Sequence, residues 1–213
     1  MKKFFIKICK FFGFEIIDQN KFISPSLNKE LNEDLSILNK KSIVLPLGEV
    51  KITRKINSIL IIIRVNTEIE IWDQNKRRLF EKPKIEYSIR SIKSLVNSII
   101  FCQSKYSNLN IKTIIIDDSS KNENLDKIKK ITKDIDAKII SLDTKKFETK
   151  IKKQKTSETF SNLASLLQCF EIGKEIGEDL IFFVEDDYLH FKTMLAEMIA
   201  TYERVSSQMG KDI

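Results

Sequence analysis

The segment Ser58–Val65, with the sequence SILIIIRV, restricts the fold of this chain more than any other segment. Its five consecutive apolar residues, from Ile59 to Ile63, include four isoleucines, whose β-branched side chains favour extended structure. A continuous apolar run of this length is typical of a strand that is buried on both faces of a parallel sheet. We therefore expect a sheet that is covered by helices on both faces.

Further strands and helices alternate along the chain. Three more apolar runs are predicted to be strands, at residues 111–116, 137–142 and 179–184, and the first and the last of these are predicted to be buried. Apolar residues spaced three or four apart predict helices over residues 86–101, 125–135, 162–176 and 193–209. The alternation predicts an α/β domain with a right-handed, doubly wound parallel sheet. The polar, lysine-rich residues 143–157 are predicted to form a mobile loop.

Residues 1–17 are predicted to form an amphipathic helix. In a helix, one face gathers the apolar residues Phe4, Phe5, Ile8, Cys9, Phe11 and Phe12, and the other gathers Lys3, Lys7 and Lys10. This pattern is typical of a helix in a membrane interface, and a helix that packs its phenylalanines on the domain has it too. Residues 18–55 are predicted to be a linker or extension with at most a short helix near residues 28–38, and residues 56–213 the domain proper.

The first residues do not predict a signal peptide, because Lys7 and Lys10 interrupt the apolar run and no small-residue cleavage site follows. The run is also too short to span a bilayer. Cys9, Cys102 and Cys169 are isolated from one another, which argues against a disulfide framework. We expect a cytoplasmic protein, either free or peripheral at the inner face of the membrane.

Composition argues against several classes of protein. The five glycines form no glycine-rich loop for phosphate, and the single histidine, His190, has no cysteines at the spacing of a zinc site. The net charge of +7 suits an anionic partner, but the lysines lie without interleaved aromatic residues or a motif that reads DNA or RNA. We therefore expect no nucleic-acid partner.

Two acidic clusters follow predicted strands directly. Asp117 and Asp118 end the second strand, and Glu185, Asp186 and Asp187 end the fourth. Ligands of open α/β sheets bind at the carboxyl ends of the strands, and adjacent carboxylates repel one another unless a cation compensates. Oxygen ligands without histidine or cysteine favour Mg²⁺ or Mn²⁺. The simpler interpretation is that these residues are solvated turn residues or helix caps.

These features together resemble the nucleotide-sugar-binding half of a GT-A fold glycosyltransferase, similar to the large inverting family 2 group. The similarity covers about residues 58–205 and rests on the pair of motifs IIIDDSS and VEDDY. It implies a Rossmann-like, mainly parallel sheet flanked by helices, here with an N-terminal helical extension. Because family members carry an acceptor-binding region well beyond the second motif, the domain is expected to be incomplete at its C-terminal end.

The resemblance also assigns roles to residues. The first motif contacts the base and ribose, so Asp118, with Asp117 beside it, is expected to bind the nucleoside. The second motif binds the metal that bridges the diphosphate, so Asp187 and Glu185 are expected to ligate Mg²⁺ or Mn²⁺, with Glu185 standing where the family usually has Asp. The other residues expected to bind the nucleotide sugar are Arg64, Asn66, Asn162 and Asp186.

The resemblance implies transfer of a sugar from a nucleotide diphosphate to a hydroxyl of a glycan or lipid-linked acceptor, with inversion. The catalytic base is not identified, because the carboxylates after the second motif, Glu197 and Glu203, belong to a predicted helix that packs on the sheet. Two alternatives stay open. One is a nucleotidyltransferase-like enzyme, and the other is a membrane-associated module that binds a nucleotide or a partner without catalysis.

Overall fold

The computed structural model describes residues 2–12, 51–68, 82–152 and 156–213. The chain divides into two units, Met1–Lys51 and Ile52–Ile213. In the first unit, residues Lys2–Phe11 form helix α1, within the predicted amphipathic segment. The predicted short helix near residues 28–38 lies outside the described residues. Among the helices that the structure describes, none is long and apolar enough to cross a membrane.

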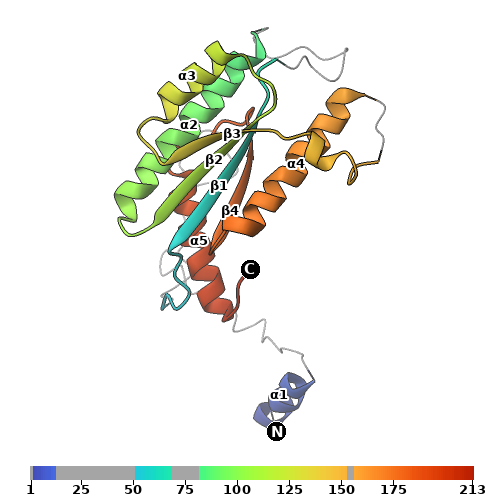
Figure 1. Cartoon of the computed structure of the whole chain (residues 1–213). Helices are drawn as coiled ribbons and strands as arrows, with labels where there is room; N and C mark the ends of the chain where they lie inside the picture. Colours follow the sequence, from blue (N-terminus) through green and yellow to red (C-terminus); the bar gives the residue numbers. More distant parts are fainter. Residues whose placement is uncertain (1, 13–50, 69–81, 153–155) are drawn as a thin grey trace. The chain divides into compact units, whose positions relative to one another are not determined.

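The second unit is built on a parallel four-stranded sheet (Figure 1). Its strands are β1 (Ser58–Val65), β2 (Asn110–Asp117), β3 (Ala137–Ser141) and β4 (Leu180–Glu185). The order is β3-β2-β1-β4, and every neighbouring pair is parallel. The predicted α/β class with a parallel sheet is therefore confirmed. The chain runs outward from β1 to β3 and then returns to place β4 on the free side of β1.

Helices cover both faces of this sheet. They are α2 (Lys84–Lys105), α3 (Asn122–Thr132), α4 (Ser157–Ile176) and α5 (Met194–Met209). Helices α2, α3 and α5 pack on one face, and α4 packs on the other (Figure 1). The predicted helices match these four, with ends that differ by up to five residues, the largest difference being the start of α4.

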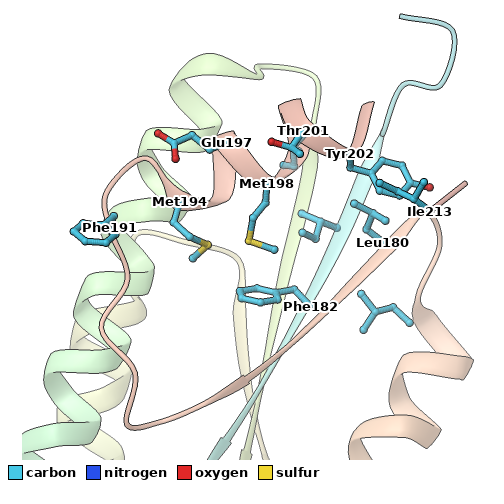
Figure 2. Close-up of a pocket in the computed structure, with 12 residues that line it drawn as sticks. Leu180, Phe182, Phe191, Met194, Glu197, Met198, Thr201, Tyr202 and Ile213 are labelled. Carbon is cyan, nitrogen blue, oxygen red and sulfur yellow. The ribbon is translucent and has the colours of Figure 1, made fainter. Parts of the chain in front are cut away.

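Strand β4 is an edge strand, and its predicted full burial is wrong. Ile181 and Phe183, on the face toward α4, are 39% and 42% exposed, because no strand among the described residues pairs with the outer edge of β4. On the other face, an apolar groove of about 540 Å³ lies between β4 and α5 (Figure 2). Figure 2 shows Phe182 of β4 beneath Met194 and Met198 of α5.

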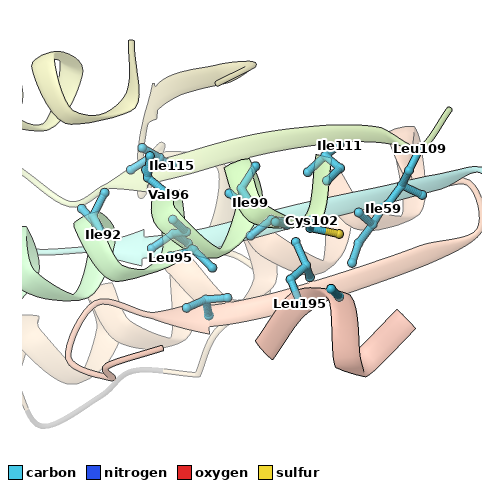
Figure 3. Close-up of a cluster of buried hydrophobic side chains, with 14 of the residues drawn as sticks. Ile59, Ile92, Leu95, Val96, Ile99, Cys102, Leu109, Ile111, Ile115 and Leu195 are labelled. Carbon is cyan, nitrogen blue, oxygen red and sulfur yellow. The ribbon is translucent and has the colours of Figure 1, made fainter. Parts of the chain in front are cut away.

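The main core lies between the sheet and the helices α2 and α5 (Figure 3). Strand β1 sends Ile59, Ile61 and Ile63 into this core. The alternate residues Leu60 and Ile62 enter a second, smaller core under α4. Because successive side chains of a strand point to opposite faces, the single apolar run SILIIIRV supplies both cores.

Phe147 is buried within the segment that was predicted to be a polar loop. Residues Lys145–Phe147 form a short 3₁₀ helix, and the ring of Phe147 is 0% exposed. It packs with Ile151 and with Ala164 of α4. A single aromatic residue among lysines has no periodicity, so the sequence pattern did not reveal this cluster.

The variant Phe147→Ala is expected to lose about 3–5 kcal/mol of unfolding free energy, because a fully buried ring is replaced by a cavity. Urea denaturation followed by circular dichroism measures this loss. The matched control is Phe191→Ala, which removes a ring that is 84% exposed and should change stability by less than about 0.5 kcal/mol. Equal losses in the two variants would contradict the described packing.

Candidate functional site

A polar cleft lies where the carboxyl ends of β1, β2 and β4 meet the start of α4. Its volume is about 420 Å³. The strand order reverses between β1 and β4, and such a switch point is where open α/β sheets bind their ligands. The lining residues are Arg64, Val65, Asn66, Lys84, Ile116, Asp118, Glu158, Asn162, Ser165, Glu185, Asp186 and Asp187.

The cleft brings together seven of the eight residues that the sequence analysis assigned to the site. The exception is Asp117, which is buried behind the cleft and does not line it. The apolar groove between β4 and α5 is less suited to a polar ligand, because Glu197 is its only charged lining residue among those described. The cleft is therefore the candidate site.

Arg64 spans the cleft from the end of β1. In the parallel register it lies opposite Glu185 of β4, with which it forms an ion pair. Its guanidinium also donates to Asn162 Oδ1 at 2.7 Å and to Ser165 Oγ at 3.2 Å, both on α4. The guanidinium is thus held by one strand and one helix at the centre of the switch point.

Asp118 is positioned by two segments, the end of β1 and helix α4. Its backbone N–H donates to the carbonyl oxygen of Val65 at 2.9 Å, which ties the end of β2 to β1. Its carboxylate accepts hydrogen bonds from Asn66 Nδ2 at 3.1 Å and from the hydroxyl of Ser161 on α4. The chain then turns through Ser119, whose φ of 63° lies in the left-handed region.

Asp117 supports this turn from below. Its carboxylate accepts from the backbone N–H of Ser120 at 3.3 Å. Burial raises the pKa of the Asp117 carboxyl, although the hydrogen bond from Ser120 acts in the opposite direction. The adjacent Asp118 adds a smaller increase to that pKa by charge repulsion.

The three consecutive acids that begin with the last residue of β4 have different surroundings. Glu185 is exposed and paired with Arg64. Asp186 is buried, and its two oxygens contact Lys84 Nζ at 2.8 Å and the Ser88 hydroxyl at 2.5 Å. Asp187 is exposed at the cleft and makes no hydrogen bond or ion pair with the described residues. Asp187 is not a helix cap, because the N-cap of α5 is Thr193.

Helix α4 closes the cleft with its first turns. Thr156 caps the helix and accepts from the N–H of Thr159 at 3.2 Å. Glu158, in the first turn, lines the cleft, and hydrogen bonds from its own backbone N–H and from Thr156 lower the pKa of its carboxyl. The exposed amide groups of a helix start favour negative charge nearby.

Among the residues that the structure describes, carboxylates outnumber cations in the cleft. Five of these carboxylates line it, at Asp118, Glu158, Glu185, Asp186 and Asp187, against the side chains of Arg64 and Lys84. Within the described residues, no group of three histidine, cysteine or acidic side chains is arranged to hold a metal. Among these described residues, Asp187 and Glu185, the pair expected from the sequence, can offer a metal ion one or two carboxylates. Mg²⁺ sites often have this composition, with water and phosphate oxygens as the remaining ligands.

Several residues of the site were missed by the sequence analysis. Lys84 and Ser88 hold Asp186 from the start of α2, and Ser161 holds Asp118 from α4. Ser88 did leave a signal in the sequence. Together with Ser91 and Ser98 it is buried on the otherwise apolar core side of α2, where a serine needs a hydrogen-bond partner.

Three other titratable residues lie away from the cleft. Glu203 accepts from the backbone N–H of Ile56 at 2.9 Å, which places it at the start of β1, the far end of the strand from the site. Glu197 lines the apolar groove. His190 is half-buried against Phe182, with ring centroids 6.4 Å apart, and burial lowers the pKa of its imidazole. None of the three lines the cleft.

Comparisons with protein-family models, with curated proteins and with solved structures give no match. The candidate site is therefore identified from the position of the cleft at the strand ends and from its lining residues alone.

The buried pair of Lys84 and Asp186 is expected to stabilise the cleft wall. Their side chains are 11% and 10% exposed, so either single variant, Lys84→Met or Asp186→Leu, leaves an unpaired buried charge. Each should lose about 3 kcal/mol of unfolding free energy, and the double variant should recover part of that loss. Additive losses in urea denaturation would show that the two side chains do not interact.

The variant Asp117→Asn is expected to gain stability over the parent as pH rises. The folded state raises the pKa of Asp117 above its ordinary value of 3.8, so the cost of burying the charge appears as pH increases above that value. Asparagine carries no charge and still accepts from Ser120. Urea denaturation at pH 4 and pH 7 measures the margin, with exposed Asp134→Asn as the control. If the stability advantage of Asp117→Asn over the parent is smaller at pH 7 than at pH 4, the raised pKa of Asp117 is contradicted.

Proposed function

We propose that this chain is a GT-A type glycosyltransferase that binds a nucleotide-diphosphate sugar in the cleft at the switch point. One observation carries the proposal. Asp118 from the end of β2 and Asp187 from the end of β4 line the same cleft, with Arg64 of β1 beside them. Asp118 and Asp187 are 69 residues apart in the sequence, so their convergence is a property of the fold and supports a joint role.

Asp118 is the proposed contact for the nucleoside. Asn66 and Ser161 fix its carboxylate, and an ionised carboxylate accepts hydrogen bonds from the vicinal hydroxyls of a ribose. Asp117 does not line the cleft, so it acts by holding the turn that presents Asp118. The sequence led us to expect that both aspartates bind the nucleoside. In this proposal Asp118 binds it, and Asp117 positions Asp118.

The diphosphate is proposed to lie between Arg64 and the start of α4. A guanidinium can bind two phosphate oxygens at once, and a helix start favours anions. Asn162 and Ser165 of α4 accept hydrogen bonds from the guanidinium of Arg64, which lies at the wall of the cleft. Asp186 engages Lys84 and Ser88, so it fixes the wall and is not proposed as a direct ligand.

Asp187 and Glu185 are the residues that would hold Mg²⁺ or Mn²⁺. Asp187 has no competing partner among the described residues. Glu185 would have to break its ion pair with Arg64 before it could bind the metal ion. The five carboxylates of the cleft disfavour a diphosphate on its own, and a divalent cation offsets that repulsion. When bound, the ion supplies charge neutralisation to the leaving diphosphate.

A second candidate is a module that binds the nucleotide sugar without turnover. It is favoured by the positions of Glu197 and Glu203, neither of which lines the cleft. A general base must lie within hydrogen-bond reach of the acceptor hydroxyl, and neither residue meets that condition for a sugar bound in the cleft. Binding and turnover therefore need separate measurements.

The first test is a thermal-shift titration with UDP and GDP, each with and without Mn²⁺. A ligand at about 100 times its Kd stabilises the folded state by about 2.7 kcal/mol, which raises the Tm of a domain of this size by roughly 5–10 °C. We expect this shift for one nucleotide, only with Mn²⁺, and expect Asp187→Asn to abolish it. The matched control is Asp134→Asn, an exposed aspartate outside the cleft.

The outcomes separate the candidates. A metal-dependent shift followed by release of UDP or GDP from the sugar nucleotide in the presence of acceptor supports the transferase. The same shift without release supports the binding module. If no nucleotide raises the Tm of a sample whose circular dichroism shows it to be folded, the cleft is not a nucleotide site.

A further inference from the structure

Helix α1 exposes a set of aromatic side chains that the proposed function does not use. It spans Lys2–Phe11, and Phe4, Phe5, Phe11 and the adjoining Phe12 are 61–86% exposed. The rings of Phe11 and Phe12 contact each other edge to face, with centroids 5.4 Å apart. Four exposed phenylalanines within nine residues are a far denser apolar surface than a water-facing helix normally carries.

The charge of α1 indicates what covers these side chains. Its ten residues include four lysines, at positions 2, 3, 7 and 10, and no acidic residue. A cationic helix rich in phenylalanine complements a surface that is apolar inside and anionic outside. An anionic phospholipid bilayer has this combination, whereas the interior of a protein interface is depleted of lysine.

We propose that α1 binds the surface of an anionic phospholipid bilayer, with its phenylalanines inserted at the level of the headgroups. The helix has ten residues, about half the number needed to span the hydrocarbon core, so it lies along the surface. Lysines near an anionic surface add electrostatic attraction, and the buried rings add apolar transfer energy. This inference is independent of the nucleotide site.

Cosedimentation with lipid vesicles tests the proposal on the full chain. We expect binding to vesicles of phosphatidylcholine with phosphatidylglycerol, and much weaker binding to phosphatidylcholine alone. The double variant Phe4→Ala, Phe11→Ala should bind at least about tenfold more weakly. The double variant Lys7→Ala, Lys10→Ala should bind the anionic vesicles about thirtyfold more weakly, and added salt should also weaken binding of the parent.

Phe191→Ala is the matched control for the phenylalanine variant. Phe191 is 84% exposed on the loop before α5, and Phe11 is 86% exposed on α1. Phe191→Ala removes one ring whose exposure is close to that of Phe11, so a response to general surface hydrophobicity would appear in this control as well. We expect vesicle binding to be unchanged by Phe191→Ala.

Cys9 offers a direct measure of insertion. Cys102 and Cys169 are buried, and burial raises the pKa of each thiol to about 11, which makes them poorly reactive. Of the three cysteines, Cys9 is therefore the one that an environment-sensitive fluorophore labels first. A blue shift of its emission on mixing with the anionic vesicles is expected if the helix enters the interface.

Three results would overturn the proposal. They are no binding to the anionic vesicles, binding that the Phe4 and Phe11 variant leaves unchanged, and emission at Cys9 that stays at its value in water. Light scattering of the same samples identifies the alternative occupant, a second copy of this chain. A dimer without vesicle binding that the double phenylalanine variant dissociates would assign the aromatic face to self-association.

Discussion

The burial of β1 on both faces is the constraint from which the rest of the domain follows. Its alternate side chains enter two separate cores, so the strand needs neighbours on both edges and helices above and below. The chain meets this requirement by laying β2 and β3 on one side and returning to lay β4 on the other. The return creates the switch point, and with it the cleft.

The electrostatics of the cleft follow from where polar residues stand at the ends of these strands. Parallel strands end at one edge of the sheet, so Arg64, Asp118 and Glu185 come together although they are far apart in the sequence. The three adjacent acids at the end of β4 would repel one another in an open loop. In the folded domain Glu185 forms an ion pair with Arg64, and Asp186 forms one with Lys84. Asp187 lies at the cleft without a partner among the described residues.

Much of the architecture could be predicted from the sequence, because long apolar runs and amphipathic spacing report burial directly. The apolar runs of β1 and β2 correctly predicted strands, and the apolar stripes of α2 and α4 correctly predicted helices. The failures were residues whose burial depends on distant neighbours. The run of β4 was as apolar as that of β1, yet two of its residues are exposed at the sheet edge. Phe147 gave no periodic signal, yet it is fully buried.

By itself, the sequence determined the elements, their alternation, the parallel sheet and the two acidic motifs at strand ends. These depend on local patterns, which each segment carries alone. Only the tertiary structure decided the strand order, the exposure of β4 and the different roles of neighbouring acids. Asp117 and Asp118 are adjacent in the chain, but one is buried beneath the turn and the other lines the cleft. Lys84 and Ser88 reach Asp186 across about 100 residues of chain, and no local pattern records such a contact.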